Sequence, residues 1–161
     1  MKARADDRRL FNEQIAVNVA SIQESKGLNL DELGRSLAAY GVERAHLKAL
    51  LECFEHAKTF GSLIQIPATL KEQLEEMNAN LRQAQRNGDL YAQLAAKDLL
   101  PLVWQALLLR MQFDAVVANP PYMGGKGMTP ALKDFARATF PDSRSDLFAV
   151  FIERGFYWCK R

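Results

Sequence analysis

Apolar residues in the first two thirds of the chain recur mostly at spacings of three and four, the period of an amphipathic helix. Asn29 and Asp31 are N-cap candidates for a helix that is predicted to run through Ala39. Tyr40-Gly41 is the predicted end of that helix. A second helix is predicted over residues 43–60. Its apolar face is formed by Leu47, Leu50, Leu51 and Phe54.

A helical hairpin is predicted over residues 67–110. Pro67 can open its first helix, whose apolar face is formed by Leu70, Leu74, Met77 and Leu81. Asn87-Gly88 breaks the pattern, and Asp89 can cap the second helix. Pro101 is expected to kink or divide that second helix. Packing of the two helices against each other is predicted in preference to dimerisation.

Three short runs have the pattern of strands instead. Ile15, Val17 and Val19 alternate with polar or small residues, after a charged helix predicted at 3–12. The other two runs are apolar and short, at residues 62–66 and 113–118. The predicted fold class is therefore α/β, predominantly helical with a few strands. Its parts are a mixed segment at 1–66, the hairpin insertion at 67–110, and a strand, loop and following helices at 113–161.

The last apolar run opens directly into Asn119-Pro120-Pro121-Tyr122. Ligands of open α/β sheets bind at the carboxyl ends of strands, so this turn is the candidate site. Asn119 offers a carbonyl and an NH2 group, and Tyr122 offers a flat face. The prolines stiffen the turn and leave its carbonyls free to accept hydrogen bonds. These groups suit an extruded nucleobase with an exocyclic amine. The alternative is a turn that only ends a strand, with Asn119 as a cap and Tyr122 on the surface.

Composition narrows the picture only slightly. The 161 residues are 48% apolar and 25% charged, which is ordinary for one globular domain. Cys53 and Cys159 make no disulfide framework, and with His46 and His56 they make no plausible zinc set. We interpret them as reduced thiols and as helix-surface or packing histidines. No membrane span or secretory leader is indicated, so a cytoplasmic location is expected.

Positive charge is concentrated after the candidate site. The net charge is only +2, but residues 120–161 carry seven Lys or Arg against four Asp or Glu. Phosphate contacts are a hypothesis for Lys126, Lys133, Arg137 and Arg144; a solvated face of mixed charge is the alternative. Lys126 lies in Gly124-Gly125-Lys126-Gly127, which lacks phosphate-loop spacing. This cluster is read as a mobile active-site loop or a plain surface loop.

Asn-Pro-Pro-Tyr after a hydrophobic strand resembles the catalytic motif of amino-group DNA methyltransferases. A longer stretch is similar to the adenine-specific methyltransferases of the bacterial phage-exclusion (BREX) systems. This second resemblance is carried by ANPPYMGGKGM (Ala118 to Met128), by PALKDF (Pro130 to Phe135) and by PDSRSDLF (Pro141 to Phe148). Segments Lys2 to Phe11 and Thr59 to Ile64 also look like upstream parts of that group.

The resemblance implies a partial Rossmann-like methyltransferase domain that acts in phage defence or restriction-modification. It implies methyl transfer from S-adenosylmethionine to the exocyclic amine of adenine in double-stranded DNA, with the adenine flipped out. The implied catalytic residues are Asn119, Pro120, Pro121 and Tyr122, and the substrate-binding residues are Lys126 and Arg144. Other phage-defence proteins are implied as partners.

The cofactor motif of this family is missing from the sequence. No strand, glycine-rich turn and acidic residue occur in series between Met1 and Phe113. The run from Ser145 to Arg161 also stops without a helix terminator. We therefore expect an internal piece of a longer enzyme that is inactive alone. Two alternatives are a non-catalytic DNA- or protein-binding module and a protein glutamine methyltransferase.

Overall fold

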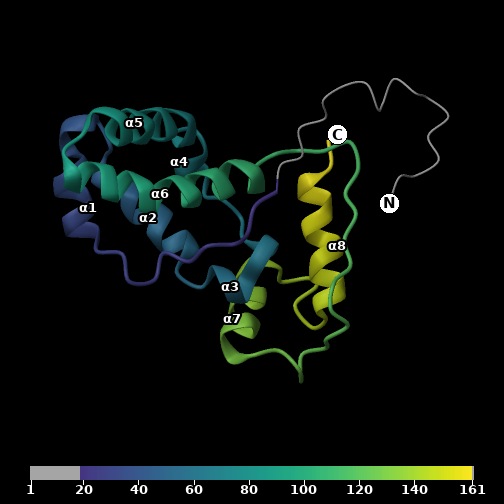
Figure 1. The fold of residues 1–161 in the computed structure, drawn as a ribbon. Coiled ribbons are helices and arrows are strands. Elements are labelled where there is room, and N and C mark those ends of the chain that lie inside the picture. Colours follow the sequence, from purple (N-terminus) through teal and green to yellow (C-terminus); the bar gives the residue numbers. More distant parts are fainter. Residues whose placement is uncertain (1–18, 161) are drawn as a thin grey trace.

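Helices dominate the structure, a computed structural model that describes residues 19–160 (Figure 1). Residues 19–110 form a helical unit, and residues 111–160 form a motif unit that contains the candidate site. The charged helix predicted at 3–12 and most of the first predicted strand lie outside the described residues. Val19, the last residue of that strand, is exposed and has no strand structure.

The first predicted helix is confirmed. Asn29 caps α1 (Leu30–Leu37) through its side-chain oxygen, which accepts from the backbone N–H groups of Asp31 and Glu32. A 3-10 turn, η2 (Ala38–Tyr40), extends it to Gly41, where φ is 71°. A left-handed residue of this kind favours glycine.

The prediction of one helix over residues 43–60 is wrong in its continuity. The chain forms α2 (Arg44–Phe54) and then the short α3 (Ala57–Phe60). His56 stands between them with a φ of −118°, outside helical geometry. Because of this break, Phe60 can reach across to the motif unit.

The hairpin is confirmed as α5 (Leu74–Asn87) and α6 (Leu90–Leu109), which lie side by side (Figure 1). Asp89 caps α6 by accepting from the N–H of Ala92. Gly88 is required between the helices, since an added Cβ would lie 2.4 Å from the Ala84 carbonyl oxygen. The helix predicted from Pro67 is divided, however, because α4 (Ala68–Lys71) ends before α5 begins.

Pro101 does not divide α6, which is helical from Leu90 to Leu109. The proline lies on the exposed face of this helix. Its missing N–H leaves the Lys97 carbonyl without its helical partner, and Lys97 is also exposed, so water can satisfy that oxygen. Exposure therefore explains why the helix tolerates the proline.

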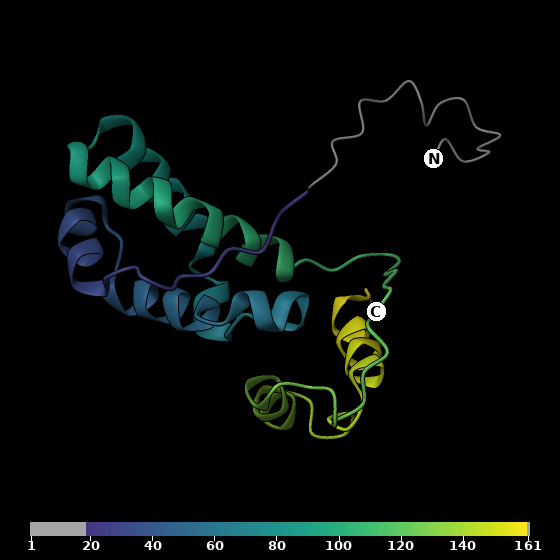
Figure 2. The same cartoon turned by 60° about the horizontal axis from the view of Figure 1, so that its bottom comes forward.

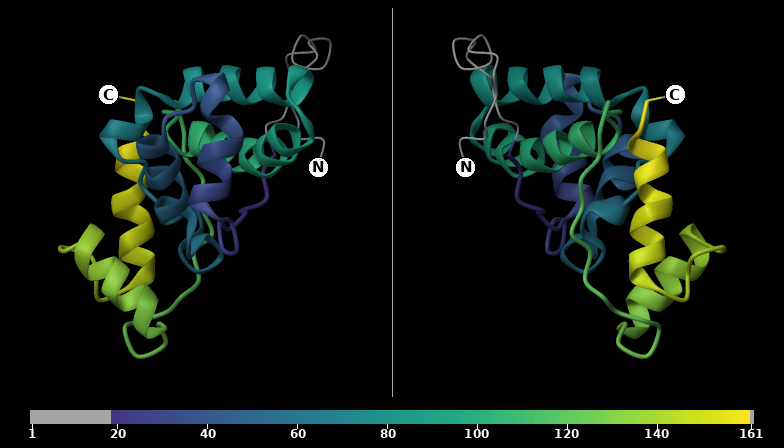
Figure 3. Two further views of the ribbon diagram at one scale, coloured as in Figure 1. Left: turned by 90° about the vertical axis from the view of Figure 1, so that its left-hand side faces the viewer. Right: turned by 90° about the vertical axis from the view of Figure 1, so that its right-hand side faces the viewer.

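Two hydrophobic clusters lie mainly within the two units, and Leu63 and Trp158 cross from one unit to the cluster of the other. The larger lies between α1, α2, α5 and α6, and it includes the fully buried Leu37, Leu47, Leu50, Phe54, Leu74, Leu81 and Leu99. The smaller surrounds α7 (Pro130–Thr139) and α8 (Leu147–Trp158), and it includes Leu63, Leu132, Phe140 and Val150. Figures 2 and 3 show α7 and α8 set beside the hairpin as a separate group. Phe60 packs against both clusters and stacks on Phe135 at 4.1 Å between ring centroids.

The two remaining strand predictions are wrong for the described residues. Gly61–Leu63 forms a 3-10 turn, η3, and residues 64–67 are irregular. The run at 113–118 is extended but has a single β-bridge, between Phe113 and Cys159. Both runs lack a neighbouring strand in residues 19–160, and a strand is stable only when its backbone groups are paired. An α/β sheet is therefore absent from the described part of the chain.

Candidate functional site

An extended segment, residues 113–124, carries the motif along the side of α8 (Figures 1 and 3). At one end the Phe113 N–H donates to the Trp158 carbonyl at 2.7 Å, and the Lys160 N–H donates to the Phe113 carbonyl at 3.0 Å. At the other end the Leu147 N–H donates to the Met123 carbonyl at 3.0 Å. The motif therefore lies between two points at which the backbone is hydrogen-bonded to α8.

The motif is exposed, and so is most of the apolar run ahead of it, which the sequence pattern had suggested as a strand. Val117 is 96% exposed and Tyr122 is 87% exposed. Asn119 is exposed as well, and its side chain has no hydrogen-bond partner in residues 19–160. It makes no capping bond in these residues, whereas Tyr122 lies on the surface as the structural alternative expects. Its carbonyl and NH2 groups are therefore available to a ligand.

Tyr122 contacts α8 through its ring. The ring stacks on that of Phe148 with 5.8 Å between centroids and 14° between planes. Phe148 is in the first turn of α8, which Asp146 caps by accepting from the Phe148 N–H at 2.8 Å. Sequence reasoning included Phe148 in the resemblance but gave it no role. The contact joins residues 26 positions apart, so local spacing does not reveal it.

The structure brings Lys126 and Arg144 onto neighbouring turns. Gly124–Gly127 is a turn closed by the Gly127 N–H on the Gly124 carbonyl at 2.9 Å. The Gly125 N–H donates to the Ser145 carbonyl at 2.9 Å, which joins this turn to residues 141–145. Lys126 and Arg144 are both exposed. They present two positive charges close to the motif.

The other candidate cations are less available. Arg137 pairs with Asp134 at 3.5 Å on α7, and Lys133 is partly buried on the same helix.

Two further cations that follow the motif are paired or buried. Lys160 pairs with Asp114 at 2.9 Å, and this contact lowers the pKa of the Asp114 carboxyl. Arg154 is only 4% exposed, and burial lowers its pKa to about 10. The positive surplus counted from the sequence is thus smaller at the surface beside the motif.

A cavity of about 300 Å³ lies between the extended segment and α8. Its lining is apolar and comprises Val116, Ala118, Pro120, Phe148, Phe151, Ile152, Gly155, Phe156 and Cys159. The sequence analysis assigned this helix no part in the site. The spacing of Phe148, Phe151 and Ile152 is the signal that identifies its apolar face.

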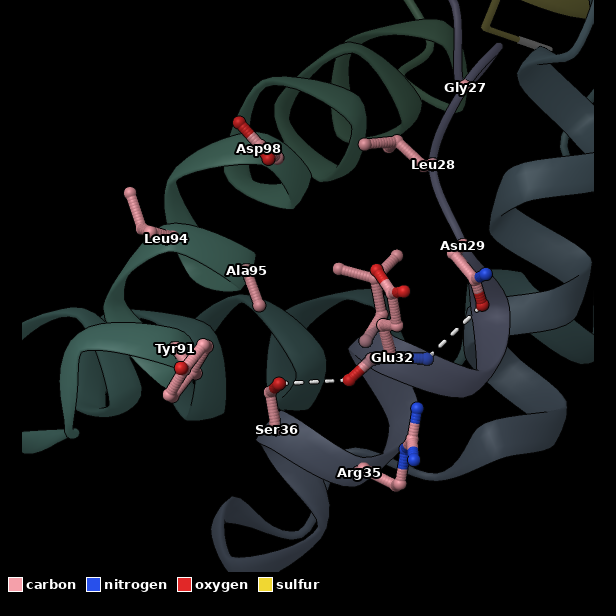
Figure 4. Close-up of a pocket in the computed structure, with 11 residues that line it drawn as sticks. Gly27, Leu28, Asn29, Glu32, Arg35, Ser36, Tyr91, Leu94, Ala95 and Asp98 are labelled. Atoms are coloured by element: carbon pink, nitrogen blue, oxygen red, sulfur yellow. Dashed lines mark hydrogen bonds between the residues drawn. The ribbon is translucent and has the colours of Figure 1, made fainter.

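A cavity of about 600 Å³, twice the volume of the one beside the motif, lies elsewhere. It lies between α1 and α6, beside Leu28, Glu32, Tyr91, Leu94 and Asp98 (Figure 4). None of the residues proposed for the candidate site lines it. We therefore place the candidate site at the motif.

Residues 19–160 contain no group of three or more His, Cys, Asp or Glu side chains arranged to hold a metal ion. The described helices include none with both the length and the apolar character of a membrane span.

Comparisons with known proteins match this chain to a family of methylases. The family described as Eco57I restriction-modification methylase matches residues 22–161. An adenine-specific methyltransferase, BrxX, of Escherichia coli O9:H4 (strain HS) is 40% identical over 97% of this chain. An adenine-specific methyltransferase, PglX, of Lacticaseibacillus casei (strain Zhang) is 30% identical over 96% of this chain. The chain spans only 15% and 13% of the lengths of these two relatives.

Proposed function

Because this chain belongs to the Eco57I restriction-modification methylase family, we propose that it carries the base-binding motif of an adenine-specific DNA methyltransferase. The observation that supports this most strongly is the presentation of Asn119-Pro120-Pro121-Tyr122. Within residues 19–160 the Asn119 amide has no hydrogen-bond partner and the Tyr122 ring is exposed, on a segment anchored at both ends.

The reacting group in this proposal is the exocyclic amine of a flipped adenine. The side-chain oxygen of Asn119 and the backbone carbonyl of Pro120 accept its two hydrogens. These two hydrogen bonds favour a pyramidal nitrogen whose lone pair points away from the ring and toward the methyl group. Pro121 holds the turn rigid, and Tyr122 stacks on the base.

Lys126 and Arg144 are proposed to contact the DNA phosphates beside the flipped base. Both are exposed on turns joined by the Gly125–Ser145 hydrogen bond, so a backbone passing the motif meets both charges. The glycine turn allows close approach of a phosphate to the backbone.

S-adenosylmethionine is the implied methyl donor, and the cavity beside the motif does not fit it. The cavity beside Pro120 is lined by apolar side chains, glycine and Cys159. It has no carboxylate for a ribose and no polar side chain for the charged amino-acid end of the donor. We infer that parts of the protein outside these residues hold the donor.

A Rossmann-like sheet is proposed to complete the domain. Residues 113–118 have exposed apolar side chains, and apart from the bridge at Phe113 their backbone is not paired with another strand in the described residues. This is expected of a strand whose neighbouring strands are missing. The α8 side chains of Ile152 and Phe156 are exposed beside it. The two relatives are several times longer than this chain. We propose that the corresponding residues of the full-length protein supply the neighbouring strands. The proposed setting is phage defence or restriction-modification, with other defence proteins as partners.

Single-turnover methylation tests this function. The full-length protein is mixed with S-adenosylmethionine carrying a labelled methyl group and with unmethylated genomic DNA, which contains every short target sequence. We expect label in N6-methyladenine. Asn119→Ala should lower the rate by a factor of about 10² or more, since it removes an acceptor for the reacting amine.

The matched control is Asn87→Ala, at the exposed end of α5. It should keep the parental rate. If Asn119→Ala also keeps that rate, the motif is structural and the catalytic proposal is wrong.

A further inference from the structure

The Tyr122–Phe148 stack is held by backbone contacts on both sides. The Met123 carbonyl, next to Tyr122, accepts from the N–H of Leu147, next to Phe148. Gly124 and Asp146 form a β-bridge one residue further out on each side. Since Asp146 also caps α8 at the Phe148 N–H, the backbone positions of both rings are set independently of the stack.

The two rings differ in how far they are supported. Phe148 is 40% exposed and belongs to a helix packed against the smaller core. Tyr122 is 87% exposed, and Phe148 is its aromatic partner in the described residues. An exposed tyrosine on an irregular segment would otherwise sample several rotamers. The contact with Phe148 is offset, with 5.8 Å between ring centroids, so most of the Tyr122 ring stays open to a ligand.

We propose that Phe148 is a positioning residue that holds the Tyr122 ring ready for a flipped base. This inference rests on the proposed function and deepens it. The base stacks on the open face of Tyr122, so Phe148, Tyr122 and base form successive aromatic layers. Phe148 itself does not touch the base; it acts by reducing the conformational freedom that Tyr122 loses on binding.

The expected effect is on capture of DNA more than on chemistry. Aromatic pairs contribute about 0.5–1.5 kcal/mol beyond their buried area, which corresponds to about twofold to tenfold in affinity. Phe148→Leu should therefore raise the half-saturating DNA concentration by about twofold to tenfold. The single-turnover rate at saturating DNA should stay within about twofold. Phe148→Tyr keeps the ring and should restore parental behaviour, because the site is open enough for a hydroxyl.

The decisive experiment is a double-mutant cycle in the full-length protein, measured by single-turnover methylation of unmethylated genomic DNA. Phe148→Leu should weaken DNA capture in the parental background. It should have no further effect in the Tyr122→Ala background, because there is then no ring to position. A residue with a merely structural role would have the same effect in both backgrounds.

Phe156→Leu is the matched control, because Phe156 is exposed on α8 about 12 Å along the helix axis from Phe148. Its effect, whatever the size, should be equal with and without Tyr122→Ala. Equal effects of Phe148→Leu in the two backgrounds would overturn the positioning role. If the parental full-length protein does not methylate the DNA at all, the proposed function is wrong. The two failures are therefore distinguishable.

Discussion

Arg154 shows how one buried side chain joins the two units of this molecule. Its guanidinium donates to the carbonyls of Ser62 at 3.2 Å, Ile64 at 2.7 Å and Leu109 at 3.1 Å. The guanidinium also lies 4.2 Å from the ring centre of Trp158, whose indole N–H donates to the same Leu109 carbonyl at 3.0 Å. Three peptide oxygens, and no carboxylate, are its hydrogen-bond acceptors in the described residues. Arg154 and Trp158 thus attach α8 to the Leu109 carbonyl at the C-terminal end of α6.

Arg154→Met should destabilise the chain by about 2–4 kcal/mol, because it removes charge-assisted hydrogen bonds and leaves buried carbonyls unpaired. Urea denaturation of the variant measures this loss. Arg82→Met, on the exposed face of α5, is the control and should change stability by less than about 0.5 kcal/mol. Similar stabilities for the two variants would show that the buried contacts contribute little.

Lys126 and Arg144 make a second prediction for single residues. Lys126→Ala or Arg144→Ala in the full-length protein should reduce the dependence of DNA affinity on salt by about one counterion each. The single-turnover rate at saturating DNA should not change. Binding isotherms at several salt concentrations measure this slope, with Lys97→Ala on the exposed face of α6 as the control. An unchanged slope for both variants would exclude phosphate contacts by these turns.

At the scale of elements, the hairpin depends on a close approach between its two helices. An added Cβ at Gly88 would lie 2.4 Å from the Ala84 oxygen and 2.7 Å from the Ala92 Cβ. Gly155, inside α8, has no atom within 4 Å of the same added carbon. The two glycines therefore predict opposite responses to one substitution.

Gly88→Ala should destabilise the chain by about 1–3 kcal/mol through overpacking. Gly155→Ala should stabilise it by about 0.5–1 kcal/mol, since alanine has the higher helix propensity and the added carbon meets no neighbouring side chain. Thermal and urea denaturation of the two variants test this pair. Destabilisation of similar size by both would mean that helix propensity and steric space do not control these positions.

At the scale of the whole molecule, the described residues contain no sheet, and the cavity beside the motif has no polar side chains for a methyl donor. The isolated 161-residue chain should therefore give no heat of binding in calorimetric titration with S-adenosylmethionine. The full-length protein is the positive control, and circular dichroism should show that the isolated chain is helical. Micromolar binding by the isolated chain would contradict the proposal that the donor site lies elsewhere.

Local signals in the sequence determined where several helices begin and end, although not the breaks between α2 and α3 or between α4 and α5. Asn29 and Asp89 cap where expected, and Asn87-Gly88 ends α5, because caps and breaks depend on neighbouring backbone groups. The motif residues Asn119 to Tyr122 were also identifiable, since their chemistry resides in the side chains and in a rigid turn. Their roles remain predictions that the mutational experiments test.

Only the tertiary structure decided which residues meet across long separations. The sequence does not show that Arg154 would bind the carbonyls of Ile64 and Leu109, or that Tyr122 would stack on Phe148. It also favoured strands at 62–66 and 113–118, where the described structure has none. A strand forms only when another strand pairs with its backbone, so its fate depends on partners that local pattern cannot supply.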